Sequence, residues 1–460
     1  MTRPSLHGGG PSVLRRLNSA AILRALRDGG ECTLSDLAGR VGLSRPTTEG
    51  VLAELIDRGL AAESAPRPGA GLGRPARRYR FRADAGHALG IDVDAHRVRL
   101  IVADLAGDVV GGHRAGLDVR SPPAERIAAV RAAVKACLTS ADVDRRSLWA
   151  VAAGTPGVVA RDGTITSCTV VPGWEGVPLG RELGRSFSCP VLVENDANLA
   201  ALAERWRGAA RDADDVVCVH AGLHTGMGAL IGGRLHRGRW GAAGEVGMLP
   251  ELGLRDTTAA LITGTDADPE ASTAALAAFE SATTPRPDAA TSRPTTSQAD
   301  AGSPRAAASQ SDGGSSRSGD SSAGGGSSRA DASRAVGSSA GGGVPRGAGL
   351  DHAERVLEAA GWGAAEAQAV VERLAARMAR GVAAMALAFD PEMIVVGGPL
   401  VRAGDLLVSE LRRRIAPLCL SPVRIEASEL ADEAVGLGAV RLALDHIDED
   451  LLRLPVGASP

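Results

Sequence analysis

A short polar run, Ser44-Arg45-Pro46-Thr47-Thr48-Glu49, contains side chains that hydrogen-bond to the edges of DNA bases. Ser44 is the expected N-cap of a helix, and Pro46 fits the first turn, where its missing N–H costs nothing. The polar residues that follow the cap are expected to face outward at the end of the helix that enters a major groove. The residues expected to contact a double-stranded DNA operator here are Ser44, Arg45, Thr47, Thr48 and Glu49.

An arginine-rich ribbon, residues 61–82, follows this helix and is expected to contact DNA as well. Arg74 stands between Gly73 and Pro75 as an extended cation, which suits a minor groove or a phosphate. Arg77 and Arg78 are the other expected DNA contacts on the ribbon. Residues 1–82 carry a net charge of +7, whereas the whole chain carries −3, so the remainder carries −10. A basic head on an acidic body is typical of a DNA-binding domain joined to a second domain with another task.

Two helices must position these polar residues. The first, residues 34–41, has one apolar face, and Gly42 supplies the positive φ that a tight turn needs. Four apolar residues are expected to form the buried face of the second helix. These are Val51, Leu52, Leu55 and Ile56. A helix, a turn, a second helix and a ribbon predict a winged helix-turn-helix over residues 12–82, after a disordered tail over 1–11. An ordinary antiparallel helix pair is the alternative.

The body begins near residue 88 with alternating apolar residues, and the pair Gly107-Asp108 predicts a hairpin turn between two strands. A helix over 124–138 and a buried strand over 149–153 come next, and a second hairpin-like run covers 216–235. A long helix over 364–389 leads to an apolar strand at 393–396. Two similar halves of this kind predict an α/β fold built by duplication.

Residues 280–349 interrupt the body with Ser, Gly, Ala, Thr, Pro and Arg and contain almost no large apolar residues. Such a segment buries too little surface to offset the entropy of ordering, so we expect a disordered insertion. A regulatory arm is the alternative to a passive insertion. The body is therefore expected in two parts, residues 88–279 and 350–447.

The composition argues against a membrane protein and against disulfides. No apolar run is long enough to span a bilayer, and the N-terminus lacks the apolar core of a signal peptide. Six scattered cysteines without a Cys-x-x-Cys pair are typical of buried thiols in a reducing compartment. We therefore expect a cytoplasmic, nucleoid-associated protein with no membrane partner.

The most specific motif of the body, Val193-Glu194-Asn195-Asp196-Ala197-Asn198-Leu199, resembles the ROK family of repressors and sugar kinases. Further family matches are Gly154-Thr155-Pro156-Gly157, Pro172-Gly173-Trp174, Gly226-Met227-Gly228, Ala243-Gly244-Glu245-Val246-Gly247 and Val396-Gly397-Gly398. The resemblance implies a winged helix-turn-helix followed by an actin-like (ribonuclease H-like) two-lobed domain. It also implies sugar contacts at Asn195 and Asp196, because the matching aspartate of family kinases deprotonates the sugar hydroxyl.

The loops that bind ATP in family kinases differ in this chain. The first hairpin of the family carries Asp-x-Gly-Gly-Thr, whereas this chain has Asp92-Val93-Asp94-Ala95-His96, and Asp94 is expected to repel a polyanion. The second loop, Gly-Thr-Gly-Val-Gly-x-Gly in the family, starts at His224 and lacks the outer glycines. Phosphoryl transfer needs backbone N–H groups around the phosphates. We therefore expect no ATP binding, no catalytic residue and no enzyme activity.

The sugar and zinc sites of the family are also altered. Met248 stands where family members have a histidine that contacts sugar and zinc, and Val170 stands where an asparagine is usual. The zinc cysteines are absent after Met248, so we expect no metal and no other cofactor. Asn195, Asp196 and Glu245 remain as the expected contacts of a sugar-like effector. Capping of a helix is the alternative role of Asn195 and Asp196.

These features together predict a DNA-binding transcriptional regulator, a repressor, with a degenerate sugar-kinase-like domain that binds an effector. We expect a homodimer or a higher homo-oligomer. One alternative is an active, ATP-dependent sugar kinase fused to a DNA-binding head. Another is an effector-independent regulator whose second domain only dimerises.

Overall fold

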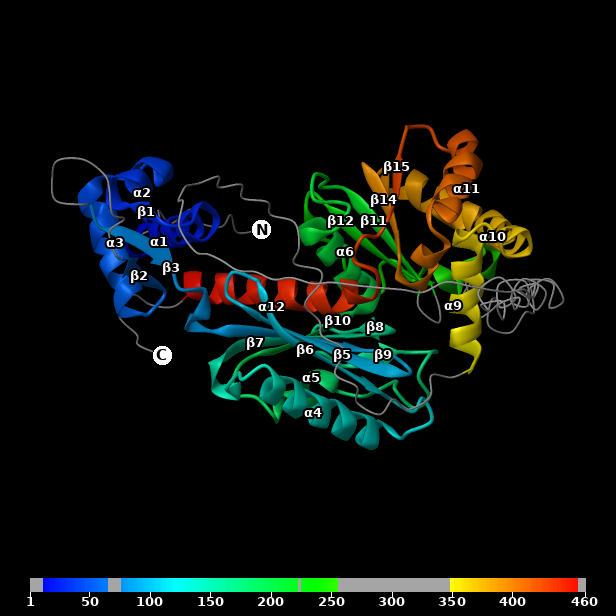
Figure 1. Cartoon of the computed structure of the whole chain (residues 1–460), viewed down its shortest axis with the longest axis horizontal. Helices are drawn as coiled ribbons and strands as arrows, with labels where there is room; N and C mark the ends of the chain where they lie inside the picture. Colours follow the sequence, from blue (N-terminus) through cyan, green and yellow to red (C-terminus); the bar gives the residue numbers. More distant parts are fainter. Residues whose placement is uncertain (1–10, 65–75, 222–224, 255–347, 454–460) are drawn as a thin grey trace, which may run out of the picture. The chain divides into compact units, whose positions relative to one another are not determined.

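The computed structural model describes residues 11–64, 76–221, 225–254 and 348–453 (Figure 1). The head consists of α1 (Pro11–Gly29), β1 (Cys32–Thr33), α2 (Leu34–Val41), α3 (Arg45–Asp57), β2 (Ala61–Ser64) and β3 (Arg78–Phe81). β3 lies between β1 and β2 and is antiparallel to both. Three helices and a small antiparallel sheet confirm the predicted winged helix-turn-helix.

The turn between α2 and α3 follows from its sequence. Gly42 ends α2 with φ of 67°, and the hydroxyl of Ser44 accepts a hydrogen bond from the Thr47 N–H at 3.3 Å. Val51, Leu52 and Leu55 are buried as predicted. The prediction for Ile56 is wrong, because its side chain lies beside the buried face of α3 and is 37% exposed.

The first lobe of the body contains a five-stranded sheet with the order β10-β7-β4-β5-β6. Its elements are β4 (His87–Val93), β5 (Arg97–Asp104), β6 (Val109–Gly116), α4 (Pro123–Ser140), β7 (Leu148–Thr155), β8 (Val158–Val159), β9 (Ile165–Ser167), α5 (Leu179–Gly184), β10 (Val191–Asn195) and α6 (Asp196–Arg207). β4 is antiparallel to β5 and parallel to β7, so a hairpin and a crossover connection meet at β4.

The second lobe contains another five-stranded sheet, with the order β13-β12-β11-β14-β15. Its elements are β11 (Val216–Ala221), β12 (Thr225–Ile231), β13 (Arg234–Leu235), η3 (Val246–Met248), η4 (Pro250–Leu252), α9 (Ala348–Gly361), α10 (Ala365–Phe389), β14 (Met393–Gly397), η5 (Gly398–Ala403), α11 (Asp405–Ile415), η6 (Ala416–Leu418), β15 (Arg424–Ala427), η7 (Ala431–Glu433) and α12 (Ala434–Arg453). β11 is antiparallel to β12 and parallel to β14, which repeats the pattern of the first lobe. The two sheets confirm the α/β fold.

Alternating side chains on the strands divide the body into separate cores. Ala88 of β4 faces the core that contains α6 and α12, whereas Leu89 and Ile91 face the core that contains α4. Helix α12 packs so closely against β4 that a Cβ at Gly90 would lie only 2.3 Å from the Gly436 carbonyl oxygen. A Cβ at Gly438 would lie 1.8 Å from the carbonyl oxygen of Leu199 on α6. Glycines thus allow α12 to contact both β4 and α6 through their backbones.

Several predicted segments lie outside the described residues or differ in extent. Residues 1–10, the wing residues 65–75, residues 222–224 and residues 255–347 are outside, so the predicted tail, Arg74, His224 and most of the predicted insertion are not described. Helix α1 already begins at Pro11, and α9 begins at Ala348. Helix α12 continues to Arg453, six residues beyond the predicted end of the body at 447.

Candidate functional site

The exposed end of α3 displays most of the predicted base contacts. Arg45, Thr47 and Glu49 are exposed, and Ser44 caps the helix at the same end. Thr48 does not fit the prediction, because its side chain is fully buried and its hydroxyl donates to the Ser44 carbonyl oxygen at 3.0 Å. The expectation that Thr48 faces outward is therefore wrong: its side chain supports the cap from inside.

The two described wing arginines differ in their surroundings. Arg77 is 63% exposed, and its guanidinium lies 3.3 Å from the carboxylate of Glu63 on β2. Arg78 is 24% exposed and donates to the backbone carbonyl of Glu31 at 2.7 Å. The Arg78 side chain thus connects β3 to the loop before β1 by a hydrogen bond. Arg77 is the more accessible of the two arginines.

A cavity of about 230 Å³ opens beside the start of α6. It is lined by residues 156–158, 167–170, 195 and 196, 225 and 226, 242, 245, 247 and 248. The strand β10 ends at Asn195, so the parallel pair β7–β10 places the first residues of α6 at the cavity, beside the turn that follows β7. The cavity brings together the predicted ligand contacts Asn195, Asp196 and Glu245.

Asn195 has a structural role at this cavity. Its side-chain oxygen Oδ1 accepts from the Asn198 N–H at 3.1 Å, which caps α6, and its side-chain nitrogen Nδ2 donates to the Gly157 carbonyl oxygen at 3.1 Å. Asn195 therefore joins α6 to the turn after β7. The side chain of Asn195 thus has the capping role that the sequence offered as the alternative.

The carboxylates of Asp196 and Glu245 face the cavity in an unfavourable electrostatic setting. Asp196 is partly buried, and burial raises its pKa to about 6, although one of its oxygens accepts from the Ala197 N–H at 2.8 Å. Burial, and then the charge of Asp196, raise the pKa of Glu245 as well. Titratable groups whose pKa is shifted by burial and that face a cavity are candidates for a functional site.

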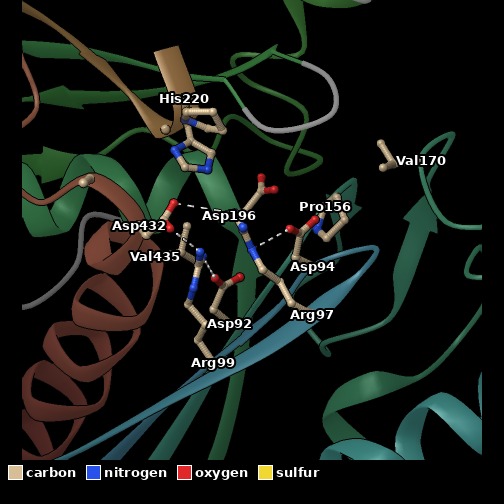
Figure 2. A pocket seen from close by; sticks show the side chains of 13 residues that line it. Asp92, Asp94, Arg97, Arg99, Pro156, Val170, Asp196, His220, Asp432 and Val435 are labelled. Atoms are coloured by element: carbon tan, nitrogen blue, oxygen red, sulfur yellow. Dashed lines mark hydrogen bonds and ion pairs between the residues drawn. The ribbon is translucent and has the colours of Figure 1, made fainter. Parts of the chain in front are cut away.

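A second, smaller cavity of about 40 Å³ adjoins Asp196, where Asp92, Asp94, Arg97, Arg99 and His220 converge (Figure 2). Burial raises the pKa of Asp92 to about 6 and lowers the pKa of His220. The His220 Nδ1 atom has no hydrogen-bond partner within the described part of the chain.

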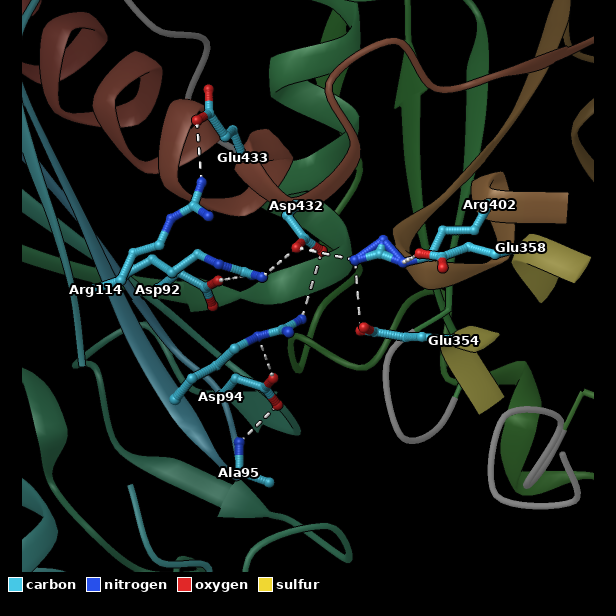
Figure 3. A network of polar contacts seen from close by, with 11 residues as sticks. Asp92, Asp94, Ala95, Arg114, Glu354, Glu358, Arg402, Asp432 and Glu433 are labelled. Atoms are coloured by element: carbon cyan, nitrogen blue, oxygen red, sulfur yellow. Dashed lines mark hydrogen bonds and ion pairs between the residues drawn. The ribbon is translucent and has the colours of Figure 1, made fainter. Parts of the chain in front are cut away.

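Charges around this smaller cavity pair with one another in a network that the sequence did not reveal (Figure 3). The carboxylate of Asp432 lies 2.7 Å from Arg99, 3.6 Å from Arg97 and 3.5 Å from Arg402. Arg99 also pairs with Asp92 at 3.4 Å. We call these residues, together with Asp94, the Asp432 network.

The network joins the two lobes and pairs Asp94 with Arg97. Arg97 and Arg99 come from β5, whereas Asp432 precedes α12 and Arg402 lies on η5 of the other lobe. The carboxylate of Asp94 accepts from the Ala95 N–H at 2.6 Å and lies 3.2 Å from Arg97. Asp94, which was expected to repel a polyanion, is thus an ion-pair partner inside the protein.

The loop between β4 and β5 is held from the other side by Arg126 of α4. This arginine is 1% exposed and donates to the carbonyl oxygens of Asp94 and Ala95, each at 3.0 Å, and of Asp118 at 2.9 Å. Its guanidinium also lies over the ring of Trp174, 5.6 Å from the centroid. Arg126 therefore fixes the backbone of this loop.

Other kinds of site receive no support from the described residues. Within them, no group of three or more His, Cys, Asp and Glu side chains could hold a metal ion. No helix in the same part of the chain is long and apolar enough to cross a membrane. The six cysteines are free, and Cys32, Cys137 and Cys218 are buried.

The chain matches two family models. The model described as "ROK family" matches residues 88–265 and 333–446, and the model described as "IclR helix-turn-helix domain" matches residues 17–64. A xylose repressor of Caldicellulosiruptor bescii is 25% identical over 240 residues, which cover 52% of this chain and 60% of that relative. The chain thus spans about three-fifths of that curated relative.

Solved structures show the same fold. A ROK family transcriptional regulator, described as a homolog of the E. coli MLC protein, superposes with a TM-score of 0.63 at 19% identity, over 96% of this chain and 99% of that one. A ROK family glucokinase from Streptomyces griseus, in complex with glucose and AMPPNP, superposes with a TM-score of 0.55 at 22% identity, over 78% of this chain and all of that one.

Proposed function

Because the chain belongs to the ROK family, we propose that it is a DNA-binding transcriptional repressor whose ROK domain binds a sugar-like effector. One observation carries the proposal: a helix-turn-helix with an exposed polar end lies on the same chain as a cavity with two carboxylates. The name of the xylose repressor supports the repressor role and the sugar class of the effector.

The proposed operator contacts divide by what they touch. Arg45, Thr47 and Glu49 at the exposed end of α3 contact base edges, with Ser44 holding the end of the helix in place. Arg77 contacts phosphate together with Arg74, so it gives up its exposed pairing with Glu63. Base contacts set the sequence preference, whereas phosphate contacts set the salt dependence.

Genomic binding is the direct test of the repressor proposal. The full-length protein is used to pull DNA from the genome that encodes it, and the recovered DNA is sequenced. Recovered sites should share one sequence and should shift in a mobility-shift assay at lower protein concentration than scrambled DNA of equal length. Equal affinity for both DNAs would refute sequence-specific recognition.

We further propose that the domain does not transfer phosphate. Family kinases approach ATP with a glycine loop at the first hairpin, but here Asp94 and its neighbours fill that place with side chains. Arg99 and Arg97 are already paired with Asp92, Asp94 and Asp432, so they are not available to a triphosphate. A nucleotide would have to break several ion pairs and would then face their carboxylates.

The competing function, a sugar kinase with a DNA-binding head, makes a different prediction. A coupled assay with ATP, magnesium and a hexose panel should show no sugar-dependent ADP release. The Streptomyces griseus glucokinase is a suitable positive control because it shares the fold. Sugar-dependent turnover abolished by Asp196→Asn would establish the kinase instead.

In a repressor, Asp196 serves as a hydrogen-bond acceptor and not as a base. The effector then acts through the lobes: a ligand held between them changes operator affinity only if it binds two arrangements of the protein differently. A homodimer on a two-fold operator would give each half-site one α3 helix and would place the protein with the nucleoid.

A further inference from the structure

The cavity beside α6 has an acidic lining among the residues that the structure describes. Asp196 and Glu245 are its acidic residues, and no arginine, lysine or histidine lines it in the part of the chain that the structure describes. The Glu245 carboxylate has no hydrogen-bond or ion-pair partner among those residues, and one oxygen of Asp196 accepts from the Ala197 N–H. A phosphate or carboxylate on a ligand would therefore meet the like charge of Asp196 and Glu245.

Nearby basic side chains are already paired. Arg97 and Arg99 approach Asp196 from the smaller cavity, but Asp92, Asp94 and Asp432 hold them (Figure 2). Arg237, from the loop that leads to Glu245, pairs with the buried carboxylate of Glu194 on β10. Recruiting any of these arginines to an anion would leave a buried or half-buried carboxylate unpaired, which is unfavourable.

Much of the remaining lining is apolar. Pro156, Val158, Val170, Ala242 and Met248 line the cavity, and Met248 is 54% exposed. Both polar atoms of the Asn195 side-chain amide already have partners: the oxygen accepts from α6 and the nitrogen donates to Gly157. A ligand that offers hydroxyl groups to the carboxylates and an apolar group to this lining would satisfy both.

Resting on the proposed effector role of this cavity, we propose that the effector is an uncharged sugar that carries an apolar group in place of one hydroxyl. Phosphorylated sugars and sugar acids are excluded by charge. The carboxylates of Asp196 and Glu245 accept the hydroxyl hydrogens, and the side chain of Met248 covers the apolar group.

The test compares matched ligands by isothermal titration on the full chain without DNA. D-Glucose, 6-deoxy-D-glucose, D-glucose 6-phosphate and D-glucuronate differ only at one carbon. We expect 6-deoxy-D-glucose to bind more tightly than glucose, and both anions to bind about tenfold or more weakly than glucose. Either anion binding as tightly as glucose, or no neutral sugar binding at millimolar concentration, would overturn the proposal.

Variants separate the two parts of the proposal. Met248→Gln, which keeps the length of the side chain, should abolish the preference for 6-deoxy-D-glucose, whereas Leu249→Gln, at an equally exposed neighbour outside the lining, should not. Glu245→Gln should weaken binding of glucose and reduce the discrimination against the anions, and Glu251→Gln should do neither. Equal effects of each variant and its control would overturn the assignment. Operator binding is measured separately, so failure of the ligand class leaves the DNA-binding proposal to its own test.

Discussion

Replacing Asp432 by Asn should destabilise the body, because this carboxylate is the common partner of three arginines from both lobes. The side chains of Asp432 and Arg99 are only 17% and 9% exposed. Breaking a buried ion pair costs roughly 3–5 kcal/mol, since it leaves an uncompensated charge. Arg99 keeps Asp92 at 3.4 Å, so we expect the lower end of that range, about 3 kcal/mol.

The neighbouring residue provides a matched control. Glu433 pairs with Arg114 at 3.3 Å, but the two side chains are 43% and 54% exposed. Exposed ion pairs contribute about 0–1 kcal/mol, so Glu433→Gln should be nearly neutral. Both substitutions remove one carboxylate charge at adjacent positions, and they differ mainly in burial.

Urea unfolding followed by circular dichroism gives the free energy of unfolding of the two variants, and thermal unfolding gives their Tm. A loss of about 3 kcal/mol corresponds to a fall in Tm of roughly 6–12 °C for a domain of this size. Burial alone would raise the pKa of Asp432, but Arg99, Arg97 and Arg402 outweigh it, so the pKa is lowered. The stabilisation that Asp432 provides is therefore present above about pH 4, the pKa of an aspartate in the unfolded chain. It is lost as the pH falls through the lower pKa that Asp432 has in the folded protein. Equal losses for Asp432→Asn and Glu433→Gln at neutral pH would refute the reasoning.

Other outcomes follow from the head, the cavity and the insertion. Arg45→Ala should relax operator preference by ~1–3 kcal/mol in a mobility-shift assay, whereas Arg120→Ala on the body should not. Thr48→Val should lower stability by ~1 kcal/mol in urea and leave base preference unchanged, because its hydroxyl bonds inside the head; an altered preference would restore Thr48 as a base contact. Asp196→Asn should keep operator affinity but lose the effector's shift of it, and wild-type effector binding should weaken below about pH 6 as Asp196 is protonated; effector binding unchanged by the substitution and by pH would contradict this role. Deleting residues 284–347 should leave Tm and operator binding nearly unchanged, because the segment contains little apolar surface; a large fall in Tm would show that it packs on the body.

Local signals made the head predictable from its sequence. A glycine at the end of α2, a serine and a proline at the start of α3, and the spacing of Val51, Leu52 and Leu55 each act over a few residues. Thr48 was misplaced because the position of a short polar residue next to a cap depends on whether its hydroxyl turns back to the helix.

The Asp432 network could not be predicted in the same way. Its members Arg99 and Asp432 are more than 300 residues apart in sequence, and only the fold brings them together. A partial signal was present: Arg97 and Arg99 alternate with apolar residues on a strand that is otherwise buried. Charges at such positions indicate buried partners, but they do not say which residues these are.

The Asp432 network also constrains how this domain could change over evolutionary time. A change at this place would require Asp94, Arg97, Arg99 and Asp432 to be replaced together, because each single replacement leaves a charge without its partner. Each intermediate would be less stable than either end point and exposed to purifying selection. The four charges are therefore expected to be kept or replaced as a unit, because no single exchange among them leaves the others paired.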